Sequence, residues 1–266
     1  MKRWILVSMV GLALGAVAEE ESTPTFFAGG DTEIDGQARD RVEQAIGKWT
    51  SLEAWGDEDP TGEPYFWDFD AVGKEVFIRI IKGGGGNQDG LLQVWLRREG
   101  EKRFELYKSY RVARFSGRLG PKKAQGDFQA PEGFYYVSRN RMNPRSNFHL
   151  SMNLGYPNEF DRYHGYTGDY LMIHGSSVSI GCYAMTDASI EQIYTLVDAA
   201  LANGQRIVRV HCFPFEMTKE NLEAWEGSEH ESFWKNLKEG WDWFEERRSH
   251  LMSALARGSI VFQSFD

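Results

Sequence analysis

Cysteine is scarce in this chain, which has two cysteines, Cys182 and Cys212, among 266 residues. Two cysteines exclude a disulfide-scaffolded mini-protein and a four-cysteine zinc site. Basic residues are also in deficit, because 30 lysines and arginines face 39 aspartates and glutamates, and the formal net charge is −9. Since phosphate binding needs a basic surface, this balance argues against a general nucleic-acid-binding protein.

Long apolar runs are absent after the N-terminal segment, which excludes a polytopic membrane protein. At the N-terminus, Lys2 and Arg3 precede an apolar stretch that ends in small residues and closes with Ala18. This order is typical of a secretory signal peptide, so we expect residues 1–18 to be removed and the mature protein to be periplasmic. The alternative is an uncleaved membrane anchor, but the run is shorter than the ~20 residues that a spanning helix needs.

The rest of the sequence divides into three parts. Residues 19–74 are expected to form a polar lead-in with one amphipathic helix over 37–49. Residues 75–213 are expected to form a β-rich domain, with a helix over 190–201 capped near Thr186 or Asp187. Residues 214–266 are expected to be helical, because apolar residues recur there at three- and four-residue steps up to Leu251 and Leu255. The strands are expected at 76–81, 91–96, 104–112, 133–137, 170–174 and 206–212. The predicted fold is a β-rich α+β domain with a flanking N-terminal helix and a helical C-terminal segment.

The segment from His174 to Asp187 combines a thiol, an imidazole and a tight turn. Cys182 follows Gly181 and precedes the predicted helix, so helix-start amides are expected to lower the pKa of its thiol below the ~8.5 of a free cysteine. The amides of Gly181 and Cys182 could receive an oxyanion, and His174 could act as the base. The hydroxyl of Ser179 could hold the loop or contact a substrate.

Other interpretations of these residues remain open at this point. A lone cysteine is often a small buried hydrophobe. Cys182, Cys212, His174 and His211 could be collected into a zinc site, but the adjacent His211 and Cys212 would point to opposite faces of a strand. We therefore expect no metal. A disulfide between the two cysteines is compatible with export but would block the thiol, so a core position is preferred for Cys212.

The motif also has a counterpart among known enzymes. Residues 174–185 read His-Gly-x₃-Ser-x-Gly-Cys-x-x-Met, and residues 130–134 read Ala-Pro-Glu-Gly-Phe. Together they resemble the active-site signature and the upstream segment of the L,D-transpeptidase family, whose catalytic domain is called YkuD-like. Within that family the sequence resembles the YafK-like branch, at residues 126–131, 143–145, 155–158, 164–165 and 179–185.

The resemblance implies a β-sandwich-type catalytic domain and a thioester mechanism that needs no cofactor. Cys182 would be the nucleophile, His174 the proton donor and acceptor, and the Gly181 and Cys182 amides the oxyanion hole. The thiol would attack the carbonyl of the third stem-peptide residue, a diamino acid, and the acyl group would pass to an amine or to water. The main family pattern has histidine and arginine where this sequence has Ile180 and Ala184.

Residues 133–158 contain no acid, although the chain as a whole is acidic. The basic side chains in this segment are Arg139, Arg141, Arg145 and His149. Because stem peptides carry carboxylates and arginine binds them bidentately, the three arginines are predicted to bind substrate. The alternative is a solvated basic loop. His164 is a further candidate for the border of the cleft, with an ordinary loop histidine as the alternative.

The predicted function is therefore a periplasmic enzyme that cross-links or remodels peptidoglycan, or attaches a protein to it, through a cysteine thioester. The expected partners are stem peptides and, in attachment or release, a peptidoglycan-attached protein. One alternative is a hydrolase or amidase that uses water to cleave the stem peptide or a peptidoglycan–protein link. Another is a non-catalytic cell-wall-binding module, which would bind the wall regardless of whether Cys182 is replaced.

Overall fold

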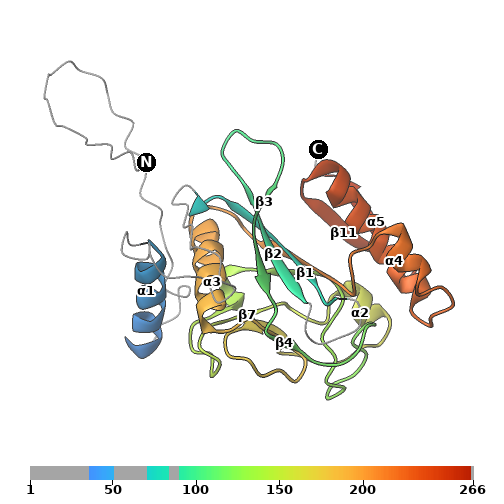
Figure 1. Ribbon diagram of the computed structural model, residues 1–266, viewed down its shortest axis with the longest axis horizontal. Coiled ribbons are helices and arrows are strands. Elements are labelled where there is room, and N and C mark those ends of the chain that lie inside the picture. The colour runs from blue at the N-terminus through green and yellow to red at the C-terminus, as the bar shows by residue number, and fades with distance from the viewer. Residues whose placement is uncertain (1–35, 51–70, 84–89, 265–266) are drawn as a thin grey trace, which may run out of the picture.

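The computed structural model describes residues 36–50, 71–83 and 90–264 (Figure 1). The predicted signal peptide and most of the predicted lead-in lie outside these residues. None of the described helices is long and apolar enough to span a bilayer.

The described chain contains both helices and strands. The helices are α1 (Gly36–Thr50), α2 (Glu159–Tyr163), α3 (Asp187–Ala202), α4 (Lys219–Glu223) and α5 (Glu231–Arg247), with a 3₁₀ helix at Arg139–Arg141. The strands are β1 (Glu75–Ile81), β2 (Leu91–Arg97), β3 (Glu105–Arg111), β4 (Arg114–Phe115), β5 (Gly133–Val137), β6 (Met142–Asn143), β7 (Ser151–Asn153), β8 (Met172–His174), β9 (Tyr183–Ala184), β10 (Val208–Phe213), β11 (Leu251–Ala256) and β12 (Ser259–Ser264). Each of the six predicted strand ranges overlaps one of these strands, and the predicted helix over 37–49 corresponds to α1.

The strands form two mixed five-stranded sheets and a separate hairpin. The first sheet has the order β3-β2-β1-β10-β5, with β1 and β10 parallel. The second has the order β4-β9-β8-β7-β6, with β8 and β9 parallel. The main hydrophobic core joins residues of both sheets, α3 and α1. The structure is therefore the expected β-rich α+β fold.

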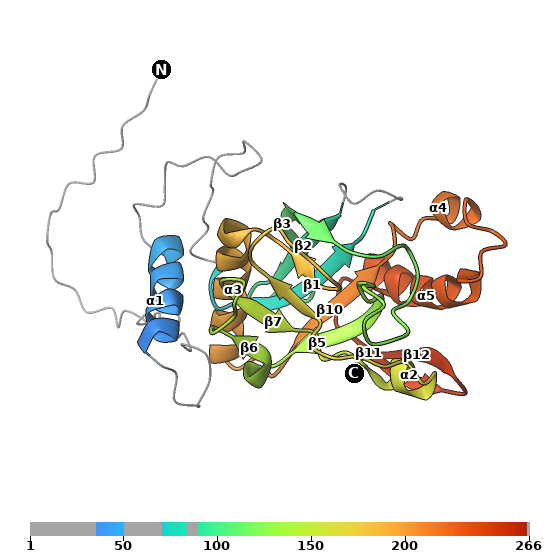
Figure 2. The same ribbon diagram turned by 90° about the horizontal axis from the view of Figure 1, so that it is seen from below.

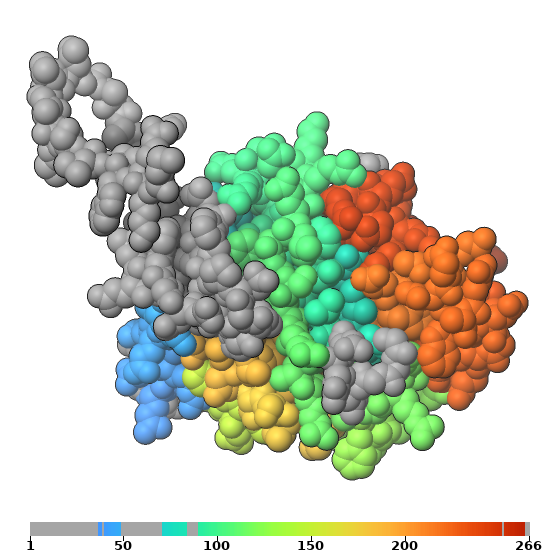
Figure 3. All heavy atoms as spheres, viewed as in Figure 1, coloured from blue at the N-terminus to red at the C-terminus, as the bar shows by residue number. Residues whose placement is uncertain are grey.

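The first sheet has a second buried face, which explains the composition of its central strands. All residues of β1 after Glu75 are buried, as expected for a strand covered on both sides. A separate cluster joins Phe134 of β5 and Phe213 of β10 to Trp234 and Trp241 of α5. The views place α1 beside α3 at one end of the molecule and α4 with α5 at the other (Figures 2 and 3).

The C-terminal segment differs from its prediction, because residues 251–264 form the hairpin β11–β12 and are not helical. Helix α5 ends where Arg248 adopts a left-handed conformation with φ of 51°. Arg257 and Gly258 both have positive φ, which is the geometry of a tight hairpin turn. The four-residue spacing of Leu251 and Leu255 fits alternate strand positions equally well, so periodicity alone misassigned them.

Candidate active site

Parallel pairing of β8 with β9 brings the predicted catalytic residues to one sheet. Ile173 pairs with Tyr183 and His174 with Ala184, so Cys182, directly before β9, lies beside Met172. The amide of Met172 donates to Sγ of Cys182 at 3.4 Å. Because alternate residues of a strand share a face, Met172 and His174 point to the same side. His174 therefore ends β8, and Cys182 lies against the first residue of that strand, two positions before His174.

The imidazole of His174 is buried and its orientation is held by the backbone. Nδ1 lies 2.5 Å from the carbonyl oxygen of Gly175, and because that oxygen only accepts, Nδ1 carries the proton. In the neutral ring Nε2 is then the unprotonated nitrogen. Burial lowers the pKa of His174, which favours the neutral form at physiological pH. The residue is 2% exposed.

The thiol of Cys182 is half-buried, and its electrostatic environment differs from the one expected. Sγ donates weakly to the carbonyl oxygen of Tyr170 at 3.7 Å. Burial raises the pKa of Cys182, although the bond from the Met172 amide works in the opposite direction. The expected lowering by helix-start amides is wrong, because α3 begins at Asp187 and β9 intervenes. The shifted pKa values therefore favour an uncharged thiol on Cys182 and an uncharged imidazole on His174 at neutral pH.

Ser179 fixes the turn that precedes Cys182. Its Oγ accepts hydrogen bonds from the amides of Cys182 at 3.0 Å and Gly181 at 3.3 Å. The same hydroxyl donates a hydrogen bond to the carbonyl oxygen of Cys182 at 2.7 Å. The φ of Gly181 is 135°, a conformation open to glycine. The two amides predicted to form an oxyanion hole are thus already bonded to Ser179. An incoming oxyanion would have to compete with this hydroxyl for them.

Phe148 contacts His174 and was not singled out from the sequence. Its ring stacks on the imidazole with centroids 4.7 Å apart and planes 30° apart, while 42% of the residue stays exposed. Asp187, which the sequence suggested only as a helix cap, also binds the preceding loop, because its carboxylate accepts a hydrogen bond from the Ser176 amide at 2.7 Å. The sequence does show that Phe148 is an aromatic residue inside the acid-free segment 133–158, but it does not show that its ring contacts His174.

The predicted substrate-binding residues are dispersed. Arg145 is exposed on the loop that carries Phe148, and Arg139 lies on the 3₁₀ helix. His164 follows α2, and its Nε2 lies 3.0 Å from the carbonyl oxygen of Gly258 in the C-terminal hairpin turn. The structure therefore connects His164 to the hairpin.

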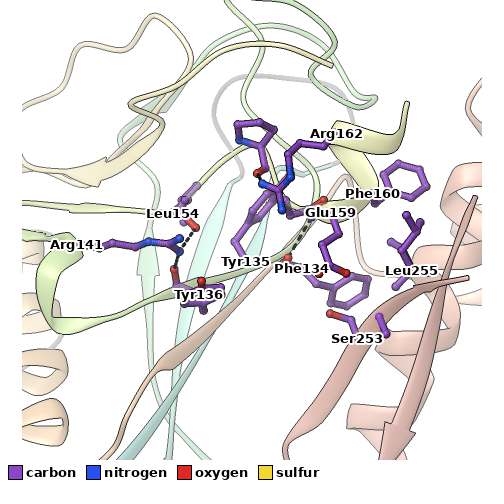
Figure 4. Close-up of a pocket in the computed structure, with 15 residues that line it drawn as sticks. Phe134, Tyr135, Tyr136, Arg141, Leu154, Glu159, Phe160, Arg162, Ser253 and Leu255 are labelled. Carbon is purple, nitrogen blue, oxygen red and sulfur yellow. Dashed lines mark hydrogen bonds between the residues drawn. The ribbon is translucent and has the colours of Figure 1, made fainter. Parts of the chain in front are cut away.

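Arg141 lies in a pocket of about 260 Å³ between β5, the start of α2 and the β11–β12 hairpin (Figure 4). Its Nη1 donates to the carbonyls of Tyr136 at 2.7 Å and Leu154 at 3.4 Å, and its guanidinium stacks over the Tyr136 ring. Among the described residues that line this pocket, none comes from the 174–187 segment. Arg141 thus lines a pocket to which Cys182 does not contribute.

Both cysteines are free, so no disulfide links Cys182 to Cys212. Cys212 is fully buried in the main core, as predicted. In the described part of the chain, histidines, cysteines and carboxylates do not gather in threes at a position that could hold a metal ion.

The different burial of the two thiols predicts selective alkylation. Under native conditions iodoacetamide is expected to modify Cys182 well before Cys212, because Cys212 is inaccessible and burial raises the pKa of its thiol well above the ordinary range. Peptide mass mapping over time measures both rates. Unfolding in urea serves as the control and should equalise them. Equal labelling of the native protein would contradict the structure.

Known proteins resemble this chain in sequence. The L,D-transpeptidase catalytic domain (YkuD) matches residues 93–211. The chain is 43% identical over 190 residues to "Putative L,D-transpeptidase YafK" of Escherichia coli K12, which is 71% of this chain and 74% of that protein. The same figures hold for the protein of that name from Escherichia coli O157:H7.

Two solved structures of the helical cell shape determining protein Pgp2 from Campylobacter jejuni align with a TM-score of 0.40. A mutant form is 19% identical, and the alignment covers 77% of this chain and 64% of that one. The other structure is 16% identical, with 80% and 81% covered. On the strength of the YafK identity and the matching catalytic domain, the chain belongs to the L,D-transpeptidase (YkuD) family.

Proposed function

We propose that this protein is an exported cysteine acyltransferase that acts on peptidoglycan stem peptides through a thioester on Cys182. The observation that carries the proposal is the position of Cys182 against Met172 of β8, the strand that ends in His174. The Gly175 carbonyl holds the Nδ1 proton of His174 and leaves Nε2 as the candidate base. Membership of a family that acts on peptidoglycan supports the substrate class. Export is proposed from the character of residues 1–18 alone.

In the first half of the proposed reaction, Sγ of Cys182 attacks a stem-peptide carbonyl carbon. Nε2 of His174 takes the thiol proton, and the carbonyl oxygen becomes an oxyanion. The C–N bond then breaks, and the imidazolium returns the proton to the departing amine. The product of this half is a thioester on Cys182 and a released amino group.

In the second half, an acceptor amine or a water molecule attacks the thioester. His174 accepts a proton from the acceptor and returns it to the Cys182 sulfur as the C–S bond breaks. An amine gives a new amide, which is transfer, whereas water gives a carboxylate, which is hydrolysis. During both attacks the oxyanion competes with Ser179 for the Cys182 amide. Arg145 is the predicted arginine best placed to meet a substrate carboxylate, because it shares its exposed loop with Phe148.

Mass spectrometry of defined muropeptides tests this function. The protein is incubated with tetrapeptide and pentapeptide muropeptides, with and without an added amine, and is compared with its Cys182→Ser variant. Amide products that depend on Cys182 would support transfer, and trimmed peptides alone would assign water as the acceptor. Muropeptide binding that is equal in both proteins, without any product, would replace the proposal by a non-catalytic cell-wall-binding module.

The acid limb of the pH profile is expected to lie below pH 6.5. Burial lowers the pKa of His174, so its folded-state pKa is below the usual 6.5 and the base stays neutral until the pH falls past that lowered value. The measurement is kcat/KM for stem-peptide cleavage between pH 4.5 and 8. A midpoint at or above 6.5 would mean that His174 is not the buried base described above.

A further inference from the structure

Helix α1 lies outside the region that matches the family's catalytic domain, yet it contacts the catalytic part of the chain. It packs beside α3 (Figure 2), with Val42 and Ala45 buried in the main core. Lys48 forms an ion pair with Glu191 of α3 at 3.0 Å. These contacts hold α1 in a defined position next to the loop that precedes β7.

Arg41 of α1 binds that loop through one atom. Its Nη1 donates to the carbonyl oxygens of Pro144 at 3.2 Å, Ser146 at 2.9 Å and His149 at 2.5 Å. Nη1 has two hydrogens for three acceptors, so at least one is shared. Charge-assisted bonds of this kind are stronger than those between neutral groups. The guanidinium of Arg41 therefore binds three backbone carbonyls of the 144–149 segment.

The 144–149 segment is also the structure that covers His174. Phe148 stacks on the imidazole, as described above. The backbone packs just as closely, because a Cβ on Gly175 would lie 2.8 Å from the carbonyl oxygen of Phe148. Gly175 itself accepts the Nδ1 proton of His174. A shift of the 144–149 segment would consequently disturb both the stacking of Phe148 on the imidazole and the hydrogen bond from Nδ1 to Gly175.

We propose that Arg41 is a positioning residue for His174, which acts by holding the 144–149 segment so that Phe148 stays stacked on the imidazole. The inference depends on the proposed function in one respect, which is that His174 is catalytic. The positioning itself is a property of the folded chain and can be measured without turnover.

Loss of Arg41 should expose His174 to water. The titratable groups on the elements that flank His174 are Cys182 directly before β9, Asp187 at the start of α3, whose carboxylate accepts the Ser176 amide, and the His149–Glu191 pair at 2.8 Å. Burial is the main cause that lowers the pKa of His174, so hydration should raise it.

The test is an NMR titration of the His174 imidazole in the full chain, assigned with a His174→Asn variant. Arg41→Ala is compared with Arg41→Lys and with Lys48→Ala, a matched loss of a cation from the same helix. The pKa of His174 should rise toward 6.5 in Arg41→Ala, by about half a unit, and stay at the wild-type value in Lys48→Ala. Arg41→Lys should restore most of the wild-type value, because an ammonium has three N–H donors.

Phe148→Ala tests the route of the effect and does not depend on Arg41→Ala remaining folded. It should raise the pKa of His174 in the same direction, while Phe148→Leu should raise it less. Where turnover is measurable, kcat should fall about threefold to tenfold in Arg41→Ala with KM little changed. A wild-type titration curve in folded Arg41→Ala or in Phe148→Ala would overturn the inference. Absence of turnover in the wild-type protein would refute the proposed function and leave the titration result standing.

Discussion

Cys182→Ala is expected to lower kcat/KM for stem-peptide acyl transfer by about 10³-fold or more, because no other group can carry the thioester. His174→Asn should cost about 10²- to 10⁴-fold, the usual contribution of a general base. Asparagine is the informative replacement, since its amide can still donate to the Gly175 carbonyl but cannot take a proton. Steady-state assays with purified muropeptides measure both losses.

The two losses should not add. If thiol and imidazole act as one unit, the Cys182→Ala/His174→Asn double variant should be about as inactive as Cys182→Ala alone. Cys212→Ala is the matched control, because it removes the other cysteine from the main core and should keep kcat/KM within about twofold of wild type. A His174→Asn variant that retains half of the wild-type activity would remove His174 from the mechanism.

The placement of His174 and Cys182 on neighbouring segments of one sheet could be predicted from the sequence because its determinants are local. Eight residues separate His174 from Cys182, and a strand end followed by a loop of small residues leaves few ways for them to meet. The pKa of the thiol could not be predicted in the same way. That prediction assumed that the helix follows Cys182 directly, and the two-residue strand β9 is too short to leave a periodic pattern.

The surroundings of the pair depend on contacts that sequence spacing does not contain. Arg41 reaches carbonyls more than 100 positions away, and the residue types of the 144–149 segment do not reveal a backbone acceptor. The arginines predicted to bind substrate share one segment but not one location, because Arg139 and Arg141 lie on the 3₁₀ helix and β6 separates that helix from Arg145. Composition identified an unusual segment, and only the fold shows that Phe148 is the residue of it that stacks on the His174 imidazole.

Glu132→Ala is expected to lower the free energy of unfolding by about 3–5 kcal/mol, because it removes the carboxylate that neutralises the buried charge of Lys82. The ion pair between them is 2.9 Å long and both side chains are fully buried. Glu132 also accepts the Gly120 amide at 2.7 Å and the Trp234 indole at 2.9 Å. For a chain of this size the melting temperature should fall by roughly 10 °C, measurable by calorimetry.

A double variant separates the charge from the packing. Lys82→Met/Glu132→Leu removes both buried charges and keeps similar volumes, so it should cost less than Glu132→Ala alone, although the Gly120 and Trp234 donors still lose their acceptor. The exposed pair of Lys123 and Glu229, 3.5 Å apart, is the control, and Glu229→Ala should cost less than about 1 kcal/mol. If Glu132→Ala were no more destabilising than Glu229→Ala, the Lys82–Glu132 pair would not be the desolvated ion pair that the fold encloses.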